Sequence, residues 1–375
     1  MTLPREARRR APVRFERRSQ MPWAMRLIVP VLAIVGGLGV GAVILLIGNH
    51  SVSGAYQAMW QASFGSSSGF DQTLVQAIPL VLTGLAVTVA LRLHIWNIGG
   101  EGQMALGAIA AAFVAFHLQH ASGPLLLLLM FAAGAAGAAA WALIAAIPRA
   151  LVGLNEIITT LFLNYIGLLL LSGLINGPWK DPTVVGFAYS KPLPNQASLP
   201  TLGSSGVSIG LYISLGIALV IWWLLDRTRY GFSLRIVGGN VRAAEYLRLG
   251  VRRRIVLVLM LSGALAGLAG VIEATTQSGR LQEGLTNNYG YVGILVAFLA
   301  RRQVIPTVIV ALLFAGLLNG GDALQATGIP SSIAQIVQAI IIIFVLAGEA
   351  GGSYRLVRRG RPREPALAPV AGGSQ

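Results

Sequence analysis

Long apolar segments, separated by shorter polar ones, dominate the chain. A helix needs ~20 mostly apolar residues to cross the hydrocarbon core of a membrane, and ten segments approach or exceed that length. They are 27–48, 72–91, 101–118, 123–146, 156–176, 206–225, 255–274, 286–300, 303–319 and 332–348. This pattern predicts an all-α fold, a polytopic transmembrane helical bundle of about ten spans.

Three parts are expected along the chain. Residues 1–26 form a basic segment, residues 27–350 form the transmembrane domain, and residues 351–375 form a proline-rich tail without regular structure. Between the spans, aromatic residues at helical spacing in 51–64 predict a helix at the outer interface. Residues 177–204, rich in Pro, Gly and Ser, predict an irregular external loop that is either a docking surface or a connector.

The basic residues predict the orientation of the chain. If the amino terminus is cytoplasmic, 25 of the 28 Lys and Arg residues lie inside, and only Lys180, Lys191 and Arg280 lie outside. Cytoplasmic loops of membrane proteins carry an excess of basic residues, so this split predicts ten spans with both termini inside. It also explains the net charge of +15 without a nucleic-acid partner; a basic RNA-binding tail is the alternative.

The composition narrows the chemistry. With 55% hydrophobic and 11% charged residues and a mean hydropathy of +0.71, the chain differs from soluble domains, which carry about 25% charged residues. The absence of cysteine excludes disulfides, thiol nucleophiles and cysteine metal sites. The four histidines form no HExxH pattern, and no GxxxxGK[ST] motif offers a phosphate-binding loop. We expect no metal and no other cofactor.

One polar segment interrupts the apolar pattern. Residues 97–103 read NIGGEGQ, and they place Asn97, Glu101 and Gln103 among three glycines between two apolar runs. Ionisable groups at membrane depth usually face a cavity or a partner, and glycines allow helices to pack closely or unwind. The segment is therefore a candidate functional site inside the bundle. Because Arg92 is near, a break at the membrane edge is the alternative.

A polar stripe marks the segment 156–176. Glu156, Thr160 and Asn164 follow i, i+4, i+8 spacing and so share one face of a helix. They either hydrogen-bond neighbouring helices or line a translocation path. Two aromatic residues, Trp96 and Tyr165, can stack on a flat or ring-shaped solute, although such residues are more often interface anchors or core.

The long inside loop, 227–254, is unusual for a connector. Residues 243–249 predict a short helix, with Gly239 and Asn240 before it and Gly250 as its carboxyl-terminal stop. A short cytoplasmic helix between glycines suits docking to a soluble partner. An anchor that only obeys the positive-inside rule explains the arginines but not this helix.

Ten spans give an internal repeat of five helices an inverted topology, because five is odd. The third and eighth spans both open with Asn and Gly, in WNIGGEGQ at 96–103 and NNYGYVG at 287–293. Inverted-repeat transporters have their sites near the midplane, at broken helices. The similarity of the two segments weakly indicates such a repeat.

Together these motifs resemble a known family, the permease subunits of ATP-binding-cassette (ABC) importers, in the branch for simple sugars, nucleosides and branched-chain amino acids. The resemblance runs from about the second span to the tenth. One departure is clear, because the family usually has Gly–Arg after the eighth span where Ala300, Arg301 and Arg302 stand here. The motifs are WNIGGEGQMALGA (96–108), NEIITTLFLNYIG (155–167), GGNVRAAEYLRLGV (238–251), YGYVGILVAFLARRQVIP (289–306) and GGDALQ (320–325).

The resemblance implies an inner-membrane transport subunit of a bacterial cell that is not itself an enzyme. It implies a second permease subunit, identical or related, a cytoplasmic ABC ATPase and an extracytoplasmic solute-binding protein, with membrane lipid around the spans. The candidate path residues are Trp96, Asn97, Glu101, Gln103, Thr160, Asn164 and Tyr165. The candidate ATPase-coupling residues are Gly239, Asn240, Ala243, Ala244, Glu245 and Gly250.

The favoured function is therefore import of nucleosides or a related sugar-containing solute. Import of simple sugars such as ribose is one alternative. An ion-coupled secondary transporter, with Glu101 and Glu156 as ion carriers, is another. An intramembrane enzyme is disfavoured because no nucleophile–base or metal set stands in the spans.

Overall fold

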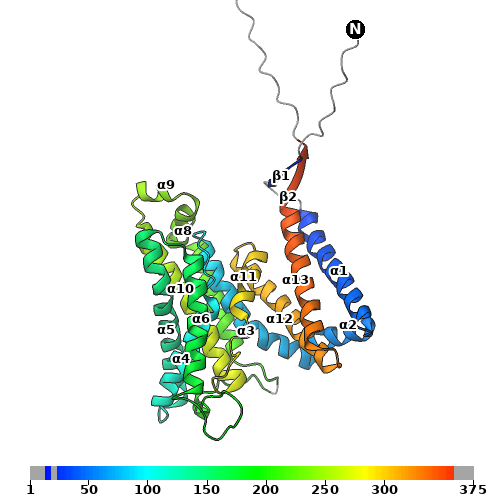
Figure 1. Cartoon of the computed structure of the whole chain (residues 1–375). Coiled ribbons are helices and arrows are strands. Elements are labelled where there is room, and N and C mark those ends of the chain that lie inside the picture. The colour runs from blue at the N-terminus through cyan, green and yellow to red at the C-terminus, as the bar shows by residue number, and fades with distance from the viewer. Residues whose placement is uncertain (1–12, 18–22, 204, 359–375) are drawn as a thin grey trace, which may run out of the picture. The chain divides into compact units, whose positions relative to one another are not determined.

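The computed structural model describes residues 13–17, 23–203 and 205–358. The chain divides into two compact units, residues 44–338 and the two terminal portions, 1–43 with 339–375. The larger unit is helical (Figure 1). Its helices are α2 (Val52–Trp60), α3 (Ser67–Leu91), α4 (Gly100–His117), α5 (Gly123–Val152), α6 (Glu156–Asn176), α7 (Gly210–Arg227), α8 (Arg229–Gly239), α9 (Val241–Tyr246), α10 (Val251–Glu273), α11 (Tyr289–Leu299) and α12 (Val304–Ala326). Two π-helical turns, η1 (Gln61–Gly65) and η3 (Ala274–Ser278), and one 3-10 turn, η2 (Asn195–Ala197), complete it.

Each apolar segment predicted from the sequence falls on one helix, and α1 (Trp23–Ile47) and α13 (Ser331–Ser353) hold the first and last. Within the described residues, seven helices are long and apolar enough to cross a membrane: α3, α5, α6, α7, α10 with its extension, α12 and α13. The apolar parts of α1 and α11 are shorter. The structure therefore shows a helical protein with several membrane-spanning helices, and the count of ten stays a prediction.

The predicted ends of several helices were wrong. α5 continues to Val152, past the expected end at residue 146, and Pro148 lies inside it. α12 continues to Ala326, past residue 319. Polar residues mark these extensions, and hydropathy alone stops at them although the backbone hydrogen bonds continue.

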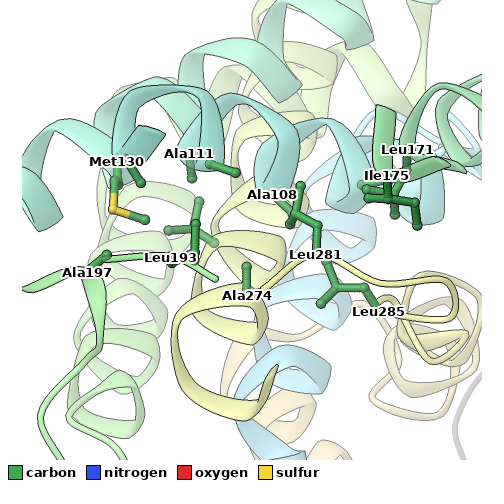
Figure 2. Packing of buried hydrophobic residues seen from close by; sticks show 14 of the residues in the cluster. Ala108, Ala111, Met130, Leu171, Ile175, Leu193, Ala197, Ala274, Leu281 and Leu285 are labelled. Carbon is green, nitrogen blue, oxygen red and sulfur yellow. The ribbon is translucent and has the colours of Figure 1, made fainter. Parts of the chain in front are cut away.

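Small residues bring α4, α5 and α10 together. A Cβ on Gly263 of α10 would lie 2.7 Å from the Ala138 carbonyl oxygen of α5, so only glycine permits this approach. Such contacts replace the hydrophobic driving force that lipid does not supply between helices. At one end of these helices, Leu193 and Ala197 of the loop 177–204 belong to the same buried cluster as Ala108 and Met130 (Figure 2). The loop 177–204 is irregular, as predicted, but it is anchored in the core.

The smaller unit holds parts of α1 and α13 and a pair of strands. Gly37 of α1 approaches α13 closely, because a Cβ there would lie 2.9 Å from the Ile341 Cα. Strand β1 (Val13–Arg17) pairs antiparallel with β2 (Tyr354–Arg358), with Val13 opposite Arg358. The pair joins the start of α1 to the end of α13, so both ends of the described chain lie at one end of this unit.

The strands correct two expectations. The tail was expected to begin at residue 351 without regular structure, but α13 reaches Ser353 and residues 354–358 form β2. The sequences VRFER and YRLVR mix apolar and basic residues with near period-2 spacing, which favours strands when a partner is present. Residues 1–12, 18–22 and 359–375 lie outside the described residues, and with them most of the basic segment and of the tail.

Candidate functional site

The chain between α3 and α4 is not helical. Arg92 ends α3 and is fixed by an ion pair with Asp226 of α7 at 2.9 Å. Residues 95–98 then have no regular secondary structure, and α4 begins at Gly100. Asn97 is almost fully buried there. Non-helical backbone at membrane depth is tolerated only where protein groups satisfy its N–H and C=O groups, so these groups need partners.

The polar stripe of α6 supplies those partners. The Trp96 N–H donates to Glu156 Oε1 at 3.3 Å, and the Ile98 N–H donates to Thr160 Oγ1 at 3.2 Å. One turn further along α6, Asn164 accepts from the Gly102 N–H at 2.8 Å and donates to the Ile98 carbonyl at 2.7 Å. Along α6, Glu156, Thr160 and Asn164 therefore bond in turn to the backbone N–H groups of residues 96, 98 and 102.

A second set of side chains closes the segment from the opposite side. The Asn97 amide donates to Gln103 Oε1 at 2.9 Å and to Ser262 Oγ of α10 at 2.8 Å. Ser262 in turn donates to the Ala86 carbonyl of α3 at 2.7 Å. Buried polar networks of this kind are stabilising only when every member is satisfied. Here the amides of Asn97 and Gln103 bond each other in both directions.

Glu101 joins the first turns of two helices. Its Oε2 accepts from the Gly290 N–H of α11 at 2.7 Å, and it also interacts with Thr286 and with the backbone of Asn288 and Tyr291. A Cβ on Gly100 would lie 3.3 Å from the Gly290 Cα, so α4 and α11 meet end to end at their amino termini. The first N–H groups of a helix lack partners within the helix and carry partial positive charge. The Glu101 carboxyl group supplies a partner at the start of α11, whereas Asn164 supplies one for the Gly102 N–H of α4.

We name these residues the junction: the segment 95–103, the α6 stripe Glu156, Thr160 and Asn164, Ser262, and the start of α11. Five of the predicted path residues, Asn97, Glu101, Gln103, Thr160 and Asn164, lie in it and are buried. Trp96 is half-buried and stacks on Phe298 at 6.2 Å between ring centroids. Tyr165 is 59% exposed and lies on the outer face of α6.

The sequence analysis missed Ser262 and Gly290. Ser262 stands beside Gly263 and Gly267, whose GxxxG spacing is typical of close helix packing and gives no signal for a hydrogen-bonding serine. Gly290 lies in the segment that resembled residues 96–103, and this similarity was the available signal. The departure from the family pattern at Ala300 has a visible consequence, because Arg301 and Arg302 both adopt positive φ, 53° and 62°, where glycine is favoured.

The segment 227–254 contains two short helices, α8 and α9. Asn240 caps α9 by accepting from the Ala243 N–H at 3.1 Å, and Gly250 opens α10 with φ of 61°. Helix α9 spans 241–246, three residues short of the predicted end. Ala244 is fully buried, whereas a Cβ on Gly239 would meet nothing within 4 Å.

The exposed surface of this segment is apolar as well as basic. Tyr246 is 90% exposed, Leu247 is 55% exposed and Val241 is 50% exposed. Glu245 and the flanking arginines are exposed too. Its inner side touches the junction region, because Gly238 of α8 packs against the Arg92 carbonyl. Sequence reasoning selected the glycines and missed Tyr246, although an aromatic residue among arginines was the available signal.

Comparison with known proteins identifies the family to which the chain is similar. A family model described as "Branched-chain amino acid transport system / permease component" matches residues 69–346. The glucose ABC transporter permease protein TsgB13 of Haloferax volcanii is 34% identical over 87% of this chain and 89% of its own length. The guanosine ABC transporter permease protein NupP of Bacillus subtilis is 34% identical over 86% and 94%. The nucleoside ABC transporter permease protein NupB of Lactococcus lactis is 32% identical over 85% and 90%.

No solved structure matches the chain. The family model covers well over half of the chain and includes the junction, the α8–α9 segment and α10 to α12. The chain therefore belongs to the family of permease components of the branched-chain amino acid transport system, whose members are ABC transporter permeases.

Proposed function

We propose that the chain is the permease subunit of an ABC importer that carries nucleosides, or a related sugar-containing solute, into the cytoplasm. The observation that carries this proposal is the junction, where two helices meet by their amino termini around Glu101 deep in the bundle. Transporters place their sites at such discontinuous helices. The solute class rests on relatives named as guanosine, nucleoside and glucose permeases.

The finer topology belongs to the same proposal. It consists of ten spans that form an inverted repeat of five helices. Both termini lie inside, and the protein is located in the bacterial inner membrane. The meeting of α4 with α11, the third and eighth predicted spans, supports the repeat. Pairing of β1 with β2 supports termini on one side, and the distribution of basic residues supports the inside.

The α8–α9 segment is the proposed contact with a separate ATPase subunit. Its exposed Val241, Tyr246 and Leu247 offer apolar anchors within a basic rim, a composition typical of interfaces. Motion there reaches α3 through Gly238 and Arg92. The anchored external loop is the proposed contact for a solute-binding protein, and a second permease subunit completes the pore. No nucleic acid takes part.

Uptake of labelled guanosine tests the solute and the energy source together. Cells that lack the chain are complemented with it, with the ATPase subunit intact or inactivated, and unlabelled nucleosides, ribose and leucine compete. We expect uptake that needs both subunits and is blocked by nucleosides. Uptake that survives ATPase loss and responds to uncouplers would instead support an ion-coupled transporter. Inhibition by ribose alone would return the solute to the simple sugars.

The coupling role has its own test. A Cβ at Gly239 would meet no atom within 4 Å, so for Gly239→Trp we expect normal amounts of protein with ATP hydrolysis uncoupled from uptake. Ala244→Trp is the comparison, because Ala244 is fully buried and its replacement lowers the amount of folded protein. Normal coupling in Gly239→Trp would remove the α8–α9 segment from the proposal.

A further inference from the structure

A polar cavity lies away from the junction, at the opposite end of α3 from Arg92. Its volume is about 320 Å³, within the range of small-molecule sites. Six of its eight lining residues are polar, and none is Lys or Arg. The lining residues are Gln72, Gln76, Glu273, Gln282, Gly284, Leu285, Asn287 and Tyr289.

The polar lining distinguishes this cavity from another cavity of the same unit. A cavity of similar volume between α7 and α12 is lined only by apolar side chains, as expected of a surface that meets lipid or another helix. Gln72 and Gln76 stand one turn apart on α3, and Glu273 ends α10 where the π-helical turn η3 begins. π-helical turns occur frequently at functional sites.

Two acceptors in the cavity have no donor. Gln76 is 7% exposed, its side chain bonds Asp322, and its Oε1 has no partner. Glu273 is also 7% exposed, and no described residue donates a hydrogen bond or forms an ion pair with its carboxyl group. Buried polar groups are almost always paired, so unpaired acceptors around an open volume point to a ligand that supplies donors. Asn287 and the Tyr289 hydroxyl add further polar atoms, 3.5 Å apart.

The cavity borders a second cavity and lies next to the junction in sequence. Gln282 lines it and also lines a second cavity of about 600 Å³ among the external loops, with Lys180, Tyr189 and Glu283. On the inner side, Tyr289 is the residue immediately before Gly290, which donates to Glu101. A solute held beside Tyr289 therefore contacts the first turn of the helix that the junction fixes.

We propose that this cavity binds the hydroxyl groups of a neutral solute, such as the ribose of a nucleoside, with Glu273 and Gln76 as acceptors. The inference rests on the proposed function and adds a site and a chemical selection to it. Hydroxyl and amine groups satisfy the acceptors, whereas a phosphate or carboxylate brings only further acceptors and a like charge. Nucleosides fit this rule, and nucleotides do not.

The absence of cysteine from the chain provides a direct test. The Gln72→Cys variant is assembled with its partner subunits in right-side-out membrane vesicles, and its reaction with a small maleimide is timed. We expect guanosine and ribose to slow labelling saturably, and guanosine monophosphate and leucine to leave it unchanged. Phe70→Cys is the control, because Phe70 is 41% exposed and lies two residues away, on the opposite face of α3.

A second variant identifies the acceptor. Adding Glu273→Gln to Gln72→Cys should raise the half-protecting guanosine concentration about ten-fold, since a hydrogen bond to a charged group is lost. Asp71→Asn, on α3 but outside the cavity lining, should not change it. Equal protection by the nucleotide, or no protection in vesicles that do take up guanosine, would overturn the cavity proposal. Loss of guanosine uptake by the wild-type complex would instead contradict the proposed function.

Discussion

The junction and the polar cavity at Glu273 are both polar regions in an apolar bundle. They differ in whether their polar groups have hydrogen-bond partners within the chain. In the junction, Asn97 and Gln103 bond each other, Asn97 also bonds a serine, and Asn164 bonds the non-helical backbone and the first turn of α4. In the cavity, Gln76 Oε1 and Glu273 remain without donors. Polar residues at membrane depth are thus of two kinds: one kind stabilises an irregular backbone, and the other stays available to a solute.

The largest effect is expected at the point where α4 meets α11. Glu101→Ala removes the acceptor for the Gly290 N–H and the partner of Thr286 and of the neighbouring α11 backbone, and the loss of several buried hydrogen bonds costs roughly 3–5 kcal/mol. We expect almost no folded protein in the membrane, measured by quantitative blotting of membrane fractions. Glu101→Gln keeps one acceptor oxygen and should restore part of the amount. Normal amounts of Glu101→Ala would show that the junction does not hold the break.

A matched pair of threonines isolates a single bond of the junction. Thr159 and Thr160 each donate to the carbonyl four residues earlier, at 3.1 and 2.7 Å, but only Thr160 also accepts from the Ile98 N–H. Thr160→Val should therefore destabilise the protein by about 1–3 kcal/mol. Thr159→Val should change it little. Thermal unfolding of the two purified variants measures the difference, and equal shifts would reject the role of the α6 stripe.

A substitution in the polar cavity should lower uptake without lowering the stability of the protein. Glu273→Gln removes a carboxylate that no described residue pairs with, so we expect no loss of stability, while guanosine uptake per folded molecule falls about ten-fold. Uptake normalised to the amount of protein in the membrane measures this. A fall in stability without a change in normalised uptake would place Glu273 with the junction residues.

The smallest effect is expected for a substitution in the loop 177–204. Asp181 accepts from the Thr183 hydroxyl at 2.6 Å and from the Thr183 N–H at 2.9 Å, and these bonds lower the pKa of Asp181. A carboxyl group with a lowered pKa stabilises the fold above its unfolded pKa, about 3.9, and loses that contribution as the pH falls through the folded value. Hydrogen exchange of residues 179–189 should therefore accelerate below about pH 4. Thr183→Val should show the faster exchange already at neutral pH.

The sequence predicted the positions of the helices well, because apolar length and basic asymmetry are local properties. It also predicted that Glu156, Thr160 and Asn164 share a face, since helical spacing alone decides that. It left open which groups the stripe contacts, because its hydrogen bonds to the backbone of residues 96, 98 and 102 exist only after the two segments pack.

Glu273 escaped prediction for a different reason. It closes an apolar segment, where a carboxylate is readily interpreted as a solvated helix end, and only the fold shows that it faces a cavity.

The most direct test of the two kinds of polar residue is the thermal unfolding of Thr160→Val and Glu273→Gln, measured side by side in the purified complex. The account predicts a lower unfolding temperature for Thr160→Val and an unchanged or higher one for Glu273→Gln. A lower unfolding temperature for Glu273→Gln, with Thr160→Val unchanged, would contradict it.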